Sequence, residues 1–286
     1  MPLHLNPQSS LAPLITAFLL AAVLPAAQGA DDGTTSDAVL TDLPTAPAGP
    51  AGAGEGDARC QLPPDLLPQQ EPLPGLKRAL LDARQPLTIV VLGSLSGAAR
   101  PPGKGVAGFP PRLQARLHEE FQTPALEPTF KVETVGRTRA LAGELAALVR
   151  RQVLPLKPAL VIWQVGRADA RQGNPPHRLG ESLSKGLEIL RQEGIDTILA
   201  DIQFHPQFEA LYRTDEYRHY VRWIAGKYDL PLLRRYEMIQ HWASSGLVDL
   251  DSASDDEQQA AYGFIQECLA LQAARMIAGA TGKVPR

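Results

Sequence analysis

Short apolar runs typical of buried strands alternate with helix-like runs from Gly75 onward. This alternation is typical of βαβ units, which form a parallel sheet covered by helices on both faces. The predicted strands are Leu87–Leu92, Thr129–Val135, Ala159–Val165, Thr197–Gln203 and Leu230–Leu233. The predicted helices are Pro111–Phe121, Arg139–Gln152, Leu179–Gln192, Asp215–Tyr228 and a final amphipathic run, Gln258–Ala278. Because parallel connections are right-handed, we predict a three-layer α/β/α sandwich around a five-stranded parallel sheet.

The first 59 residues differ in composition from the rest of the chain. Residues 1–30 include an uncharged apolar stretch that ends in small residues, as a secretory signal peptide does. No Lys or Arg precedes that stretch, so a retained N-terminal anchor is the alternative. Residues 31–59 are rich in Pro, Gly, Ala and acidic side chains, a composition that predicts a disordered linker. Residues 60–286 are predicted to form the folded domain. We therefore expect an extracytoplasmic protein, periplasmic or secreted, with membrane contact only through an uncleaved N-terminal segment.

Charge and motif content exclude several classes of partner. The formal net charge of the chain is −3, and the linker holds the acidic excess, so the folded domain is close to neutral. A near-neutral domain gives no reason to expect nucleic acid as a partner. Since no Cys or His pair shows metal-ligand spacing and no phosphate-binding loop is present, we expect neither a metal nor a cofactor. Trp163, Trp223 and Trp242 are interpreted as core residues.

Two cysteines, Cys60 and Cys268, flank the predicted domain. In an oxidising compartment such a pair can form a disulfide that closes a loop of roughly 200 residues and stabilises the fold by about 3 to 5 kcal/mol. Because spacing alone fixes no geometry, one buried thiol and one exposed thiol are the alternative.

Three predicted strand ends carry recognisable motifs, Val91-Leu92-Gly93-Ser94-Leu95-Ser96-Gly97, Val161-Ile162-Trp163-Gln164-Val165-Gly166-Arg167-Ala168-Asp169 and Ile198-Leu199-Ala200-Asp201-Ile202-Gln203-Phe204-His205-Pro206. These stretches resemble the SGNH/GDSL hydrolases, in particular secreted bacterial members, and the likeness runs from about Cys60 to Met276. The resemblance implies an SGNH-hydrolase, flavodoxin-like fold with an esterase-type site at the carboxyl ends of the strands. In such enzymes a Ser attacks the ester carbonyl, a His takes its proton, and backbone amides with an Asn side chain bind the oxyanion.

Carried over position by position, the catalytic blocks of that family are degenerate. The nucleophile falls on Leu95, the Gly of the second block on or near Thr138, and the oxyanion Asn on Ala168. Leu supplies no nucleophile and Ala no donor. The last block should read Asp-x-x-His before the closing helix, but residues 251–254 and 255–257 lack the base, and no His follows His241.

Several residues near the predicted site remain candidates. Ser94 and Ser96 flank the lost nucleophile, and either hydroxyl is more simply explained as a hydrogen-bonding group of the turn. His205 lies at a predicted strand end, where it would serve an unorthodox Ser-His pair or bind a ligand hydroxyl, with an architectural role as the simpler reading. The resemblance implies that Asp169 has a structural role. Arg167 is interpreted as a solvated charge; the alternative is that it pairs with Asp169 or with a bound anion. The residues expected to line the cleft are Gly93, Leu95, Thr138, Gly166, Arg167 and Ala168.

Two functional hypotheses follow. The favoured one is an exported SGNH-hydrolase-like protein that has lost catalysis and keeps a binding or accessory role on acylated envelope saccharides or an envelope partner protein, ligands suggested by family analogy alone. The alternative is a working esterase or acyl-ester hydrolase with a site rearranged around Ser94 or Ser96 and His205. A Ser hydroxyl within hydrogen-bond reach of His205 would favour the alternative.

Overall fold

The computed structural model describes residues 55–68, 71–82, 86–94, 107–122 and 128–282. The chain divides into two units, Met1–Pro47 and Ala48–Arg286, and every described residue belongs to the second. The predicted signal or anchor at residues 1–30 and most of the predicted linker therefore lie outside the described residues. No helix within the described part of the chain is long and apolar enough to cross a membrane.

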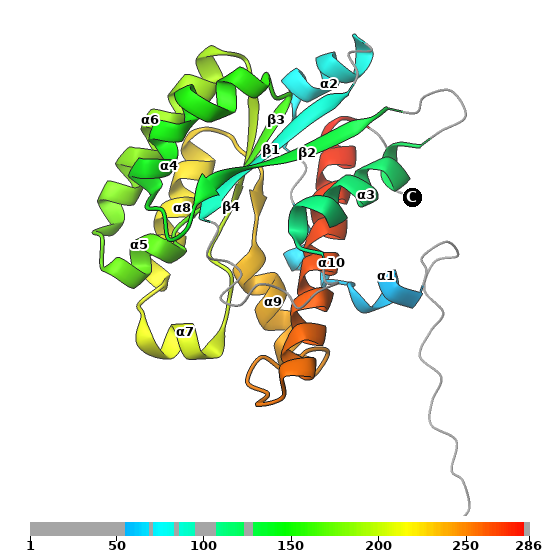
Figure 1. Cartoon of the computed structure of the whole chain (residues 1–286), viewed down its shortest axis with the longest axis vertical. Helices are drawn as coiled ribbons and strands as arrows, with labels where there is room; N and C mark the ends of the chain where they lie inside the picture. The colour runs from blue at the N-terminus through cyan, green and yellow to red at the C-terminus, as the bar shows by residue number, and fades with distance from the viewer. Residues whose placement is uncertain (1–54, 69–70, 83–85, 95–106, 123–127, 283–286) are drawn as a thin grey trace, which may run out of the picture. The chain divides into compact units, whose positions relative to one another are not determined.

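A five-stranded parallel sheet forms the centre of the fold, as predicted (Figure 1). Its strands are β1 (Leu87–Ser94), β2 (Phe130–Arg137), β3 (Leu160–Gln164), β4 (Asp196–Ala200) and β5 (Leu232–Leu233). The order across the sheet is β2-β1-β3-β4-β5, and all four pairings are parallel. In this flavodoxin-like order the chain moves outward from β1 in both directions, which makes the carboxyl ends of β1 and β3 the switch point where such folds bind ligands.

Alternate residues of the central strands β1, β3 and β4 pack into two separate cores, which explains why these strands are continuous apolar runs in the sequence. In β1, Ile89 and Val91 pack on one side of the sheet, and Val90 and Leu92 on the other. The first side is covered by α2 (Pro74–Leu81), α3 (Phe109–Phe121), α9 (Arg235–Ser244) and α10 (Asp255–Ala280). The second side is covered by α4 (Ala142–Leu148), α6 (Pro176–Gln192) and α8 (Asp215–Lys227) (Figure 1). The predicted three-layer arrangement is confirmed.

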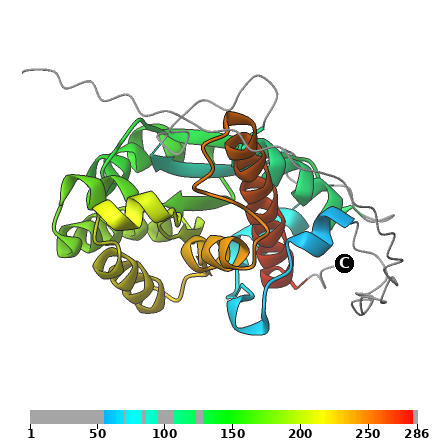
Figure 2. The same cartoon turned by 90° about the horizontal axis from the view of Figure 1, so that it is seen from below.

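Short helices follow the carboxyl ends of the central strands. Helix α5 (Arg167–Gln172) begins three residues after β3, and α7 (Pro206–Leu211) begins shortly after β4. Figure 2 shows α7 and α9 from this side of the sheet. Beyond α4 the chain continues through a π-helical turn, Val149–Val153, and a 3₁₀ turn, Leu154–Leu156. A further 3₁₀ turn, Pro64–Leu66, precedes α2.

The boundary of the predicted linker needs a correction, because residues 55–59 are helical rather than disordered. Helix α1 (Glu55–Arg59) is tied to the domain by a disulfide between Cys60 and Cys268. The Asp57 carboxylate forms ion pairs with Arg116 at 2.8 Å and Arg275 at 3.4 Å. Composition alone predicts no order there, because the partners that hold α1 come from α3 and α10.

Helix α10 is longer than predicted and is not amphipathic. Consecutive residues Leu269, Ala270 and Leu271 are all buried, so no single polar stripe runs along the helix. Since the helix packs beneath the sheet and also against α3 and α1, several of its faces are apolar. Trp223 is also a correction, because it is 55% exposed on α8, whereas Trp163 and Trp242 are core residues as predicted.

Candidate functional site

Small residues bring the ends of the central strands close together at the carboxyl edge of the sheet. Gly93 of β1 pairs with Gly136 of β2, and on its other side it meets Gln164 of β3. A Cβ atom added to Gly93 would lie 3.1 Å from the Gln164 Cβ atom, closer than such atoms normally approach. The Gln164 side chain therefore occupies the space that a larger residue at position 93 would need.

Gly166 turns the chain from β3 into α5. Its φ of +94° lies in the region that favours glycine, and a Cβ there would approach Ile202 Cγ1 at 2.8 Å. The turn places Arg167, Ala168 and Asp169 in the first turn of α5, at the carboxyl edge.

The Asp169 carboxylate accepts hydrogen bonds that stabilise the local structure. The donors are the Ala142 amide at 3.1 Å and Asn174 Nδ2 at 2.7 Å, and the residue is 1% exposed. Burial raises the pKa of Asp169, while the bonds from Asn174 and Ala142 oppose that rise. The side chain joins the start of α5 to the start of α4, and its neighbour Ala168 offers only a buried methyl group.

Arg167 is half-buried, which differs from the expected solvated charge. Its guanidinium carbon lies 4.1 Å from the centre of the Phe208 ring, and Nη1 donates to the Gln203 carbonyl at 3.4 Å. It forms no ion pair with Asp169. Burial, followed by the nearby charge of Arg171, lowers the pKa of Arg167.

His205 stands at the carboxyl end of the β4 segment, just before α7. Its backbone carbonyl accepts from the amides of Phe208 and Glu209, both at 3.0 Å, so the main chain of His205 begins the helix. Burial and the positive charge of Arg167 lower the pKa of the imidazole, whereas the charge of Asp251 raises it. The charges of Arg167 and of Asp251, from the last loop, thus both act on the His205 imidazole.

The last loop is a helix-capping loop. Ser254, three residues after Asp251, caps α10 and accepts a hydrogen bond from the Glu257 amide at 3.5 Å. Ser252 Oγ contacts the Glu257 carboxylate, and the Ser252 carbonyl accepts from Gln258 Nε2 at 2.8 Å. Residues 251–257, the two fragments nearest to the expected Asp-x-x-His block, contain no His.

The predicted nucleophile region is largely outside the described residues. Ser94 ends β1 with its backbone paired to Arg137, but its side chain is not described, and Leu95 and Ser96 lie outside the described ranges. Thr138 is an exposed turn residue directly after β2, followed by Arg139 with a φ of +57°. The predicted meeting of a Ser hydroxyl with His205 stays a prediction.

Sequence reasoning missed two buried charged residues, Asp201 and Arg235, at the carboxyl edge of the sheet. Asp201 follows β4, Arg235 begins α9, and the Arg235 Nε donates to the Asp201 carbonyl at 2.8 Å. The Asp201 carboxylate accepts from the Tyr236 amide at 3.1 Å. Burial raises the pKa of Asp201 to about 6, and burial lowers that of Arg235 to about 10. An acid directly after an apolar strand was the available signal.

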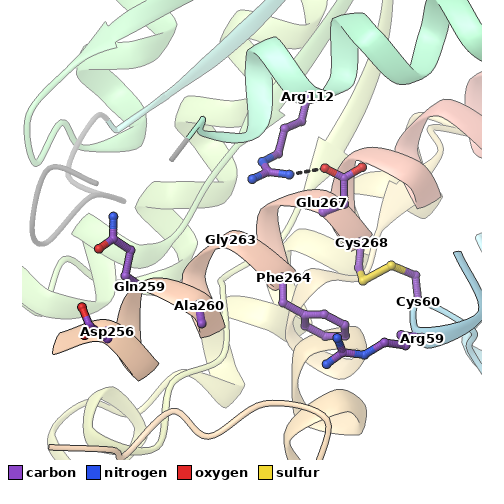
Figure 3. A pocket seen from close by; sticks show the side chains of 10 residues that line it. All are labelled: Arg59, Cys60, Arg112, Asp256, Gln259, Ala260, Gly263, Phe264, Glu267 and Cys268. Atoms are coloured by element: carbon purple, nitrogen blue, oxygen red, sulfur yellow. Dashed lines mark hydrogen bonds and ion pairs between the residues drawn. A yellow bond between two sulfur atoms is a disulfide. The ribbon is translucent and has the colours of Figure 1, made fainter. Parts of the chain in front are cut away.

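A pocket of about 500 Å³ lies along α10, between α1 and α3 (Figure 3). Three of its charged groups already have partners, because Arg112 pairs with Glu267 and the Arg59 guanidinium lies 5.0 Å from the centre of the Phe264 ring. The disulfide of Cys60 and Cys268 forms part of its wall (Figure 3). Of the predicted site residues, only these two cysteines line the pocket. Within the described ranges no group of three His, Cys, Asp or Glu side chains could hold a metal ion.

Comparison with known proteins identifies the family. The model of the Non-GDSL lipase-like family matches residues 59–283. The crystal structure of TesA is 21% identical over 66% of this chain and 99% of its own, with a TM-score of 0.50. The lipase/acylhydrolase from Enterococcus faecalis is 18% identical over 68% of this chain and 96% of its own, also at 0.50. No curated protein matches the chain. At these identities the solved structures show the fold alone.

Proposed function

We propose that this chain, which belongs to the Non-GDSL lipase-like family, is an exported and catalytically degenerate relative of the SGNH/GDSL hydrolases. It keeps the hydrolase scaffold and acts in a binding or accessory role on acylated envelope saccharides or on an envelope partner protein. The disulfide supports export, since such bonds persist mainly in oxidising compartments.

One observation carries the loss of catalysis. Ala168, a buried methyl group, stands where the resemblance places the oxyanion Asn, and residues 251–257, at the start of α10, contain no His where the resemblance places the catalytic base. Losing one oxyanion donor costs roughly 100- to 1000-fold in rate, and losing the base of a triad costs more. Asp169 offers no replacement, because its carboxylate already accepts bonds from Ala142 and Asn174.

A second candidate, a working esterase, is favoured by the surroundings of His205. Because burial lowers its pKa, the imidazole is neutral at neutral pH and able to accept a proton. Asp251 is near enough for its charge to raise that pKa, as an orienting acid in a triad would. This candidate requires Ser94 or Ser96 to reach the imidazole.

Hydrolysis of short-chain aryl esters by the purified full chain separates the two candidates. We expect no turnover above that of the His205→Ala variant, and no change in Ser94→Ala or Ser96→Ala. His219→Ala is the matched control, since His219 is exposed on α8. Turnover that disappears in His205→Ala and in one of the two Ser variants, but not in the control, would overturn the degenerate assignment.

The binding role has its own test. Calorimetric titration of the full chain with acetylated and de-acetylated oligosaccharides of the same length should give tighter binding of the acetylated form. Equal affinities, or no binding of either, would contradict acyl-saccharide recognition and leave the envelope protein as the proposed partner.

A further inference from the structure

We propose that Arg167 is the recognition group for an oxyanion of the ligand, a carboxylate, sulfate or phosphate group, at the carboxyl edge of the sheet. The inference rests on the binding role proposed above, and it names the chemistry of the group that such a ligand presents. Its basis is a guanidinium that the fold holds in place and partly buries without giving it a carboxylate partner.

The guanidinium is fixed between two strand ends. Arg167 itself belongs to the β3–α5 turn, while both of its contacts, the Phe208 ring at 4.1 Å and the Gln203 carbonyl at 3.4 Å, belong to the segment after β4. Phe208 is only 4% exposed, so the ring is a firm support. A planar guanidinium stacked on an aromatic ring is restricted in orientation, and only one of its five N–H donors is used by these contacts.

The nearby carboxylates are occupied by other groups. Asp169 accepts from the Ala142 amide and from Asn174, and Glu209 accepts from Thr214 Oγ1 at 2.6 Å. No carboxylate of the described residues lies within ion-pair distance of Arg167. The charge of Arg171, one turn further along α5, lowers the pKa of Arg167, while Glu209 and Tyr212 raise it without forming an ion pair.

A partly buried charge that forms no ion pair is costly, and the cost is relieved when an anion binds. The fork of a guanidinium matches the two oxygens of a carboxylate, sulfate or phosphate group, and such charge-assisted bonds are stronger than those between neutral groups. The pKa of Arg167 is lowered, with burial as the main cause, so the nearby negative charge offsets that cost only in part. The oxyanion can belong to a saccharide, as a uronate or sulfate, or to a small free anion.

Calorimetric titration of the full chain at low ionic strength distinguishes these sources. The probes are tetragalacturonate, the neutral cellotetraose, inorganic phosphate and acetate. The variants are Arg167→Met, which removes the charge and keeps the packing on Phe208, and Arg167→Lys, which keeps the charge without the fork. Arg171→Met is the matched control, since it changes net charge equally at an exposed position of the same helix.

We expect at least one oxyanion probe to bind more tightly than cellotetraose, with a loss of about tenfold or more in Arg167→Met. The affinity of Arg167→Lys for that probe should lie between those of the native chain and Arg167→Met. The affinity of Arg171→Met should stay within about threefold of that of the native chain. Tighter binding of tetragalacturonate than of phosphate and acetate assigns the oxyanion to a saccharide, and the reverse assigns it to a small anion.

The NMR titration of His205 gives a readout that does not depend on the affinity for any one saccharide. Its resonance is assigned with His205→Gln. Because the charge of Arg167 lowers the pKa of His205, saturating phosphate should raise that pKa in the native chain and not in Arg167→Met.

Three outcomes overturn the inference: unchanged anion affinity in Arg167→Met, an equal loss in Arg171→Met, or no effect of any anion on His205 or in calorimetry. Tight binding of cellotetraose without a preference for charge leaves the binding role intact and removes only the anion site. If the chain hydrolyses esters and also binds anions through Arg167, the proposal of lost catalysis is wrong and the anion site stands.

Discussion

The absence of a side chain at Gly186 allows Trp163, the largest residue of the central strand β3, to be buried. Trp163 of β3 is 0% exposed, and its ring occupies the space beside Gly186 of α6. A Cβ atom at Gly186 would overlap Trp163 Cη2 and lie 2.6 Å from Cζ3. Packing against Trp163 therefore requires glycine at position 186, although alanine is otherwise favoured in the interior of a helix.

Gly186→Ala should lower the free energy of unfolding by about 1 to 3 kcal/mol, since the added methyl forces the ring or the helix to move. Urea denaturation gives this value. Gly226→Ala is the control, because a methyl group added to Gly226 of α8 would meet no packing neighbour within 4 Å. That substitution should stabilise the fold by up to about 1 kcal/mol. Equal effects of the two substitutions would contradict the packing argument.

Asp201 makes stability depend on pH in the direction opposite to an ordinary ion-paired acid. Burial raises its pKa to about 6 in the folded protein, above the ordinary value of 3.8. The folded state therefore binds more protons than the unfolded state between about pH 4 and 6, and this group's contribution to stability falls as pH rises through that window.

The stability of the native chain relative to Asp201→Asn should accordingly fall by about 2 to 3 kcal/mol between pH 4 and pH 7. The Asn side chain keeps the acceptor for the Tyr236 amide, so the fold is preserved. Urea denaturation of both proteins at several pH values measures the difference, with Asp65→Asn at an exposed position as the control. A difference that does not change with pH would show that Asp201 titrates as an ordinary acid.

At the scale of elements, helix α1 depends on a covalent link. The disulfide joins residues 208 positions apart, and the backbone carbonyl of Cys60 accepts from Gln272 Nε2 of α10 at 2.8 Å. The ion pairs of Asp57 are partly exposed, so they contribute on the order of 1 kcal/mol or less.

Replacing both cysteines, as Cys60→Ser with Cys268→Ser, should lower the free energy of unfolding by up to about 5 kcal/mol. The urea midpoint measures the loss, and limited proteolysis should then cut first near α1. Asp57→Asn, which removes only the ion pairs, should shift the midpoint far less. If the double variant unfolds at the native midpoint, the disulfide is not the anchor of this segment.

The central strands β1, β3 and β4 could be predicted from sequence because they are buried on both faces and are therefore continuous apolar runs, whereas the edge strand β2 is partly exposed. The short helices could not be predicted, since α5 and α7 have six residues each, too few to show a helical period. Helix α9 was missed too, and α10 was misread because its apolar residues cover several faces. Only the location of the site could be predicted from the sequence. Arg167 stacks on Phe208, which lies 41 positions further along the chain, and no local sequence pattern indicates a contact between residues so far apart.

At the scale of the whole molecule, we propose that the chain keeps the scaffold of a hydrolase without its chemistry. The family match covers residues 59–283, and the sheet order places β1 and β3 at the switch point of the fold. At that edge the described side chains serve structure: Gly166 makes the turn, Asp169 joins two helices, and Ser254 caps a third. We propose that Arg167, at the same edge, serves ligand binding.

The most direct test of this account is labelling of the purified full chain with a serine-reactive fluorophosphonate, followed by mass-spectrometric mapping of the peptides. An active SGNH esterase treated in parallel serves as the positive control. We expect that control to be labelled and no serine of this chain to carry the adduct. An adduct on Ser94 or Ser96 that disappears in His205→Ala would contradict the account and identify a working nucleophile.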